Sequence, residues 1–195
     1  MLAGVLGIVV VAGIWAWLSY NRFVRQRQLI DNSWSNVDTE LKRRYDLIPN
    51  LVETAKGYMA HERQTLEAVT AARGAAASGL QAANANLGDP NAMQQLAAGQ
   101  GQLNAALGRL FAVAEAYPDL KANQNMLALQ EELTSTENKV AFSRQAYNDS
   151  VLTYNNRRQT FPTSVLAGMF NFAEASPLEI PPDHPEMRDA PKVQF

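Results

Sequence analysis

The first apolar stretch of the chain is an unbroken run that carries no charge. It extends from Leu2 to Leu18, and Ser19 and Tyr20 can lengthen it. A helix needs about 17 to 25 apolar residues to cross the hydrocarbon core of a bilayer. The pattern therefore predicts a transmembrane anchor over residues 1–20. A cleaved signal peptide is the main alternative, but the run lacks a basic start and an Ala-x-Ala ending.

Aromatic and basic residues gather at the carboxyl end of this run. Trp15, Trp17 and Tyr20 lie where an aromatic belt forms at a membrane interface. A basic flank follows, made up of Arg22, Arg25 and Arg27. Because positively charged flanks stay in the cytoplasm, we expect a single-pass protein of the inner (plasma) membrane with a short N-terminus outside and a cytoplasmic C-terminal domain.

Beyond the anchor, apolar residues recur at alternating steps of three and four, which is the period of one helix face. This stripe runs from Ile30 to Val69 and predicts a long helix over about residues 20–77. Pro49 interrupts the pattern, since proline removes a backbone donor and crowds the preceding turn. We expect a kink or a true break near Leu47 to Pro49.

A change of composition marks the next boundary. Residues 74–101 are rich in alanine, glycine, asparagine and glutamine, and the string from Asn84 to Asn91 carries the clearest turn signal. We therefore expect a flexible loop at about residues 78–92, after the first long helix.

Two more helices are predicted after that loop. One apolar run extends from Leu96 to Tyr117 and stops there, because the residue before a proline is disfavoured in the helical region. Pro118 suits the first turn of the next helix, whose heptad-spaced apolar residues continue from Met126 to Phe161. The predicted fold class is all-α, with a transmembrane helix followed by an antiparallel bundle of three to four long helices.

The chain after the bundle is rich in proline. Six of the nine prolines lie beyond Phe161, which predicts a bundle domain over residues 21–172 and an extended, poorly packed tail over residues 173–195. Apolar residues at 165–172 predict a short helix docked on the bundle, with contact to the bilayer surface as the alternative. The terminal string from Val193 to Phe195 is a candidate peptide ligand or a frayed end.

Five charged residues occupy positions on the helical stripes that apolar residues would otherwise take: Arg44, Glu62, Glu137, Arg144 and Arg158. A charge that faces a bundle core is costly unless it is paired. These residues are therefore candidates for ion pairs between helices or for a wet interface with another chain.

The chain offers few groups for catalysis. It has no cysteine and two histidines, so thiol nucleophiles and thiolate metal sites are excluded. His61 begins a zinc-protease-like string, but Thr65 stands where the second histidine ligand is required. We expect no enzyme activity, no metal and no cofactor. The net charge of −2 argues against a nucleic-acid partner.

Several strings of this sequence resemble the LemA family of bacterial membrane proteins. The most specific lies within residues 32–53 and contains Arg43, Arg44, Tyr45, Asp46, Pro49 and Asn50. Supporting strings lie at residues 56–62, 117–123, 129–138 and 147–155. The resemblance implies a short extracytoplasmic N-terminus, one spanning helix and a cytoplasmic helical bundle.

The same resemblance implies no catalytic residues. Magnetosome-membrane proteins in the family imply a role in membrane organisation for at least one branch. A partner surface is expected on the motif around Pro49 and on the helix after Pro118.

Three functions are compatible with these features. The leading hypothesis is a non-enzymatic scaffold or interaction protein, anchored in the lipid bilayer by its N-terminal helix and self-associating into a homo-oligomer. One alternative is an adaptor or regulatory subunit of a membrane protease or another envelope quality-control system, with a membrane protein as partner. Another is a bundle that binds a lipid or apolar ligand near Phe170 and Phe172.

Overall fold

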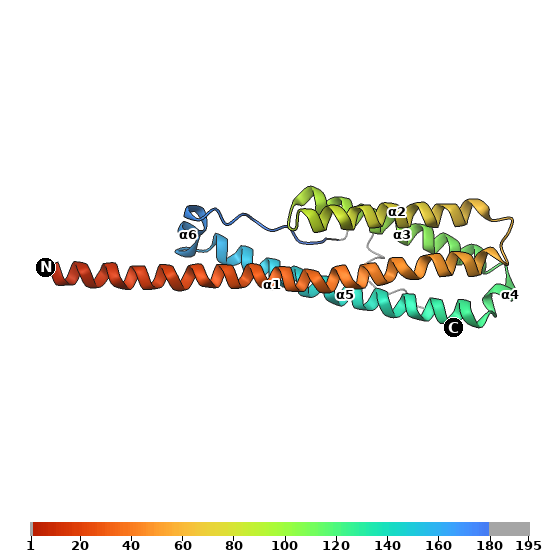
Figure 1. The fold of residues 1–195 in the computed structure, drawn as a ribbon, viewed down its shortest axis with the longest axis horizontal. Helices are drawn as coiled ribbons and strands as arrows, with labels where there is room; N and C mark the ends of the chain where they lie inside the picture. Colours follow the sequence, from red (N-terminus) through yellow and green to blue (C-terminus); the bar gives the residue numbers. More distant parts are fainter. Residues whose placement is uncertain (1, 180–195) are drawn as a thin grey trace.

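One helix runs the whole length of the elongated molecule (Figure 1). The computed structural model describes residues 2–179, and in it α1 (Leu2–Lys56) is continuous over 55 residues. At 1.5 Å per residue this helix is about 80 Å long. Its N-terminal part projects beyond the other helices with its apolar side chains exposed. Within the described residues it is the one helix long and apolar enough to cross a membrane, as the sequence predicts for the anchor.

The rest of α1 lies in the bundle and buries the predicted stripe, including Ile30, Trp34, Val37, Leu41, Ile48 and Leu51. A true break at Pro49 is wrong, because α1 continues to Lys56 and the chain reverses at residues 57–62 instead. Proline at this position leaves the carbonyl of Tyr45 without its usual helical donor. The side chain of Arg73 takes that place, with its Nε 2.7 Å from the Tyr45 oxygen. A second helix thus repairs the defect.

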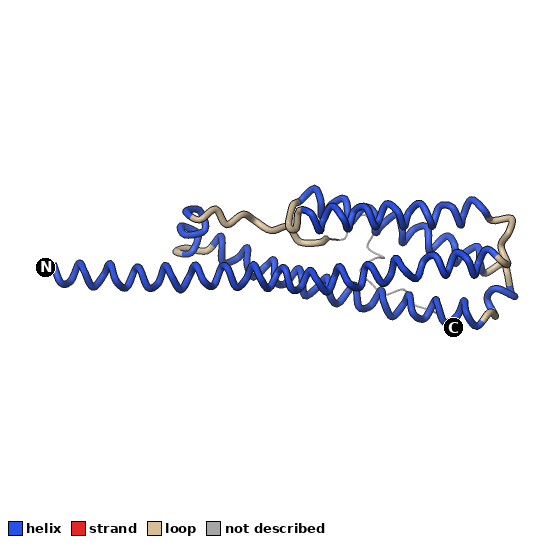
Figure 2. The backbone as a smooth tube through the Cα atoms, viewed as in Figure 1, coloured by secondary structure: helices blue, strands red, loops and turns tan. Residues whose placement is uncertain are grey.

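Four long helices form the bundle (Figures 1 and 2). α2 (Arg63–Ala85) runs back along α1, and α3 (Pro90–Ala114) returns beside α2. After the single-turn α4 (Pro118–Lys121), α5 (Gln124–Gln159) runs back toward the anchor. The tightest neighbours are α2 with α3 and α1 with α5. The predicted all-α class is confirmed, and residues 2–179 contain no strand.

The third predicted helix begins later than expected. α4 ends after one turn, and α5 starts at Gln124 rather than at Pro118. Asn123 causes the restart, because its side chain accepts hydrogen bonds from the backbone amides of Asn125 and Met126 and so caps the new helix.

The loop expected at about residues 78–92 is mostly helix. α2 continues to Ala85 and α3 begins at Pro90, so the turn covers only residues 86–89. The glycines of this region act as packing residues. A Cβ on Gly79 would lie 2.8 Å from the Cα of Leu96, and a Cβ on Gly99 would lie 2.9 Å from the Cα of Ala76. The composition that suggested a loop instead lets two helices approach backbone to backbone.

α6 (Thr163–Met169) docks on the anchor end of the bundle, as the sequence predicts. Leu166 and Ala167 are buried, and the ring of Phe172 stacks on Phe23 of α1 with centroids 4.8 Å apart. α2 and α3 stop short of this end, so here the bundle consists of α1, α5 and α6 (Figure 1).

The described part of the predicted tail is extended but well packed. Asn155 and Asn148 of α5 each form paired hydrogen bonds with the backbone of this segment, at Ala175 and at Leu178. The backbone amide of Ser176 donates to the carbonyl of the α2–α3 turn residue Gly88 at 3.0 Å. The poor packing expected from residue 173 is therefore wrong through residue 179. The candidate ligand Val193–Phe195 lies outside the described residues.

Candidate functional site

Arg44 lies in the middle of the bundle with 5% of its side chain exposed. Its Nη2 is 2.8 Å from Oε1 of Glu137 on α5, so two of the five seam charges pair with each other. The same guanidinium donates to Gln100 of α3 at 2.9 Å and to Asn104 one turn further along. One side chain of α1 therefore connects α3 with α5.

Tyr45 extends these contacts to α2. Its hydroxyl donates to the backbone carbonyl of Ala76 at 3.3 Å and accepts a hydrogen bond from the Gln100 amide. Its own carbonyl accepts from Arg73. These residues join all four long helices. We call them the buried polar layer and define it as Arg44 and Tyr45, which are buried, together with four half-buried residues, Arg73, Gln100, Asn104 and Glu137.

Burial shifts the pKa of two members of this layer, Arg44 and Tyr45. Desolvation lowers the pKa of the Arg44 guanidinium, and the neighbouring Glu137 carboxylate acts in the opposite direction. Desolvation also raises the pKa of Tyr45 to about 12, although Arg44 opposes that shift. The phenol is therefore neutral near pH 7. Contacts of this kind pair particular turns of the four helices with one another. They are consistent with the interpretation that the charges set the register of the helices.

The other three seam charges have different surroundings. Glu62 is half-buried, with Oε1 3.5 Å from the hydroxyl of Tyr117. Arg158 donates from Nε to the backbone carbonyl of Phe172 at 2.9 Å. Arg144 is half-buried, and burial lowers its pKa, but no acidic side chain among residues 2–179 forms an ion pair with it. Arg144 is thus the seam charge that best fits the wet-interface interpretation.

The motif residues divide between the core and the surface. Arg44 and Tyr45 are buried, whereas Arg43 pairs with Glu132 of α5 at 3.1 Å on the exposed side of the bundle. The remaining motif residues are exposed: Asp46, Pro49 and Asn50. The motif therefore builds part of the polar layer and also presents an outward face.

Three members of the polar layer are missed from the sequence: Arg73, Gln100 and Asn104. Gln100 and Asn104 lie within the helix predicted from Leu96 to Tyr117, but that prediction identifies only the apolar positions of the helix. A signal was present, because Gln100 lies four residues after Leu96 and Asn104 lies three residues before Leu107 on the apolar stripe of α3.

The predicted interfacial residues lie along the exposed part of α1. Trp15 and Trp17 are exposed, as are Arg22 and Arg25 in the following turns. Tyr20 differs, because its ring contacts Phe170 edge to face, with centroids 5.0 Å apart. The end of the apolar run is therefore in contact with α6.

A pocket of about 440 Å³ lies where α5 gives way to α6. Its lining combines the polar groups of Arg158, Ser164 and Asn171 with the ring of Phe172. The pocket bears on the ligand-binding alternative, which placed an apolar ligand near Phe170 and Phe172. Phe172 lines it and Phe170 does not.

Comparison with known proteins gives a family and several relatives. The model of the LemA family matches residues 33–195. Magnetosome protein MamQ 2 of Paramagnetospirillum magneticum is 28% identical over 173 residues, which cover 81% of this chain and 64% of that protein. Magnetosome protein MamQ of Magnetospirillum gryphiswaldense is 28% identical over 170 residues, with 80% and 62% covered. Protein LemA of Metamycoplasma hominis is 26% identical over 175 residues, with 87% and 75% covered. The chain thus spans a little under two thirds of the length of the two MamQ proteins.

Proposed function

Because the chain belongs to the LemA family, we propose that it is a non-enzymatic scaffold that is anchored in the inner membrane, carries its bundle on the cytoplasmic side and self-associates. The observation that carries this proposal is the continuity of α1. The exposed apolar run and the buried stripe belong to one helix with no linker between them. The anchor therefore sets both the height and the tilt of the bundle.

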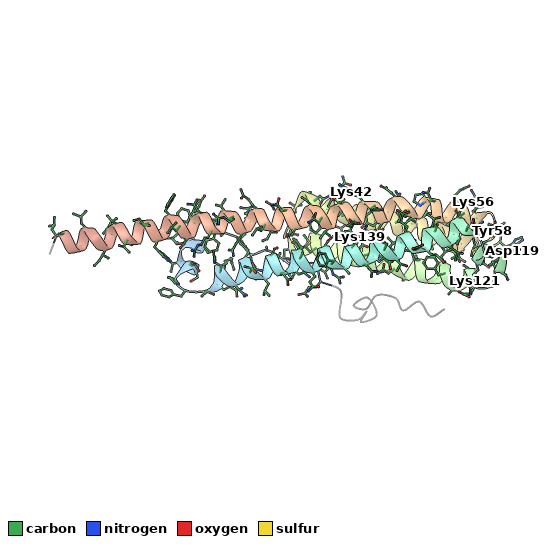
Figure 3. The ribbon with its side chains drawn as sticks, turned by 90° about the horizontal axis from the view of Figure 1, so that it is seen from below. Lys42, Lys56, Tyr58, Asp119, Lys121 and Lys139 are labelled. Carbon is green, nitrogen blue, oxygen red and sulfur yellow. The ribbon has the colours of Figure 1, made fainter. Side chains whose placement is uncertain are left out.

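This arrangement supports a role for the bundle as a spacer that holds its distal end at a fixed distance from the membrane. From Ser19 to Lys56, α1 extends about 55 Å at 1.5 Å per residue. Figure 3 shows Lys56, Tyr58, Asp119 and Lys121 together at the end opposite the N-terminus. A partner that binds this polar end would be held at a set distance from the bilayer.

Two further observations support the orientation and the non-enzymatic role. The exposed Arg22 and Arg25 follow the apolar run, where positive charges favour the cytoplasmic side. In the buried polar layer, the Arg44 guanidinium donates to Gln100 and Glu137, the Gln100 amide donates to Tyr45, and Tyr45 is held in its neutral form.

A linker experiment tests the spacer. A photo-cross-linking amino acid at Tyr58, at the distal end, should capture a discrete product in cells. Insertion of four glycines after Tyr20 should abolish that product while the protein stays in the membrane fraction, because the height and tilt are no longer fixed. A four-alanine insertion at the same place is the matched control and should retain more of the product, since it adds the same number of residues and about 6 Å of length without breaking the helix. Cross-linking that survives the glycines unchanged would contradict the proposal.

Self-association has its own test. Mass measurement of the detergent-solubilised chain should give more than one copy per particle. A monodisperse monomer in several detergents, together with an absence of self-cross-links in native membranes, would contradict this part.

The exposed motif residues favour a second candidate, an adaptor for a membrane protease or another quality-control system. Asp46 and Asn50 lie on the surface beside the buried layer and have no role in the core. If they bind a partner, the variant D46A/N50A should lose a stoichiometric partner in affinity purification from native membranes. Replacement of the exposed Lys42 by Ala is the control that should retain it.

A further inference from the structure

The end of the bundle next to the anchor exposes a group of large apolar side chains. Phe161, Val165, Met169 and Phe170 are 79%, 55%, 71% and 53% exposed. They belong to α6 and its flanks, whose opposite side is buried through Leu166 and Ala167. We call these four residues the α6 patch. Contiguous exposed apolar surface marks contact with a partner or a membrane.

The patch lies at the level where the apolar run of α1 ends. Tyr20 is two residues past Leu18, and its ring contacts Phe170 with centroids 5.0 Å apart and Phe172 with centroids 5.7 Å apart. Figure 1 shows α6 beside α1 at this height, between the projecting part of α1 and the rest of the bundle. If α1 spans the bilayer, α6 lies in the headgroup region, where amphipathic aromatic side chains concentrate.

Basic residues lie on the parts of α1 and α5 that are next to α6 in the sequence or in the fold. Three are on α1 and two at the end of α5: Arg22, Arg25, Arg27, Arg157 and Arg158. Among residues 2–179, Arg158 is the member of this group that has an ion-pair partner, Glu174 at 3.2 Å. A group with this excess of positive charge attracts anionic lipid headgroups. Exposed apolar side chains and unpaired arginines at the same end of a bundle are typical of a surface that rests in the membrane interface.

We propose that α6 lies on the surface of an anionic phospholipid bilayer, with the α6 patch among the headgroups and these arginines of α1 and α5 at lipid phosphates. This inference rests on the membrane anchoring proposed above and adds a second point of contact. Because α1 has no linker, the bundle tilts together with its anchor in the bilayer, and a second contact at the membrane surface limits that tilt. A second copy of the chain is the competing occupant. The continuity of the patch with the anchor and its positive charge favour lipid.

The absence of native cysteine allows a direct test on the full chain. A single cysteine in the variant Met169→Cys is labelled with an environment-sensitive fluorophore, and the protein is reconstituted into vesicles of equal parts phosphatidylcholine and phosphatidylglycerol. Quenching by phosphatidylcholine with a spin label on its acyl chain reports contact with lipid. The matched control is Phe142→Cys, which is also highly exposed but lies about 25 Å along α5 from its Gln159 end.

We expect quenching at position 169 to be several-fold stronger than at position 142, and weaker at position 169 in vesicles of phosphatidylcholine alone. Flotation of the same vesicles measures anchoring separately. Weak and equal quenching at both positions in protein that floats would overturn the α6 contact and leave the anchor intact. Protein that does not float would overturn the anchor, and the α6 contact with it. Equal quenching in both lipid mixtures would overturn the preference for anionic lipid.

Two additional measurements separate lipid from a second copy. If oxidation joins the Met169→Cys cysteines of two chains in a disulfide in high yield, and the spin-labelled lipid does not quench the fluorophore, the patch binds a second copy of the chain. That result would overturn the proposal. In the labelled chain, F161E/V165E should reduce quenching, because acidic groups are repelled by the anionic surface. Replacement of the exposed Leu152 of α5 by Glu should leave quenching unchanged.

Discussion

The two tightest helix pairs of the bundle are held together by opposite means. α2 and α3 approach through Gly79 and Gly99, where an added Cβ would overlap the backbone of the other helix. α1 and α5 are joined by large side chains, in the ring pairs Phe23–Tyr154 and Trp34–Tyr147 and the ion pair Arg44–Glu137. One interface should suffer from added atoms and the other from removed ones. The buried polar layer links the two pairs.

Removal of the central side chain from the α1–α5 interface should have the largest effect. Arg44→Ala leaves Glu137, Gln100 and Asn104 without their shared donor, at an expected cost of about 3 kcal/mol. In a domain of this size that lowers the unfolding temperature by roughly 10 °C, which circular dichroism of the detergent-solubilised chain can measure.

A second variant tests the cause of that loss. R44M/E137M replaces the pair by apolar side chains and should recover part of the stability, because no unpaired charge remains. A loss of less than about 0.5 kcal/mol in Arg44→Ala would show that the layer contributes little to stability.

The α2–α3 interface should respond to one added methyl group. Gly99→Ala forces apart two backbones, with an expected cost of about 2 to 3 kcal/mol from overpacking. Gly108→Ala, in the same helix, is the matched control because no atom lies within 4 Å of its added Cβ. That variant should gain about 0.5 to 1 kcal/mol from helix propensity. Equal effects of the two variants on thermal unfolding would refute close packing at Gly99.

Alkaline pH should weaken the link between the pairs through Tyr45. Burial raises the pKa of Tyr45 to about 12, from an ordinary value of 10. Because the folded state holds this proton more tightly than the unfolded state, its contribution is complete below pH 10 and is lost as the pH rises toward 12. The expected loss is about 2 kcal/mol.

Comparison of Tyr45→Phe with the original chain isolates this contribution. The free energy of unfolding should fall less steeply between pH 10 and pH 12 in the variant. Tyr58→Phe, at an exposed position, is the control and should not change the slope. Identical slopes in all three proteins would be evidence against a raised pKa at Tyr45.

The smallest effect is expected at the repaired carbonyl in α1. Arg73→Met removes the donor to the Tyr45 oxygen and should cost about 1 kcal/mol. Pro49→Ala restores the backbone amide that normally bonds this oxygen, so the same Arg73 substitution should cost less in the Pro49→Ala background. A double-mutant cycle by thermal unfolding measures the coupling energy between Pro49 and Arg73. A coupling energy of zero would show that Arg73 does not compensate for the proline.

The contrast between the pairs also explains what could be predicted from the sequence. The stripe from Ile30 to Leu51 can be predicted because its apolar side chains repeat with the helical period. Arg44 and Glu137 can be recognised in the sequence as charged residues on such apolar stripes. Only the structure shows that they form an ion pair with each other. Gly79 and Gly99 could not be interpreted from the sequence, because a glycine in a turn and a glycine in a close helix contact give the same local pattern. Only the backbone of the facing helix distinguishes a helix contact from a turn.

Pro49 and the polar layer were obscured for the same reason. A proline in a helix is tolerated when another element satisfies the freed carbonyl, and Arg73 lies 24 positions later in the sequence, on a different helix. Gln100 and Asn104 lie within the predicted helix from Leu96 to Tyr117, but as neutral polar residues they do not differ from the exposed positions of that helix. Both features depend on contacts between helices that are distant in the sequence, and no local pattern reveals such contacts.

The extended segment at residues 173–179 has a mechanical consequence. It connects α6 to the α2–α3 turn, but Asn155 fastens it to α5 at Ala175 before Ser176 reaches Gly88. If α6 is displaced, the hydrogen bonds between Ala175 and Asn155 of α5 resist the movement first. The hydrogen bond between Ser176 and Gly88 of the α2–α3 turn is affected only after them. A displacement of α6 should therefore reach the close α2–α3 contact only after the hydrogen bonds between Asn155 and Ala175 have yielded.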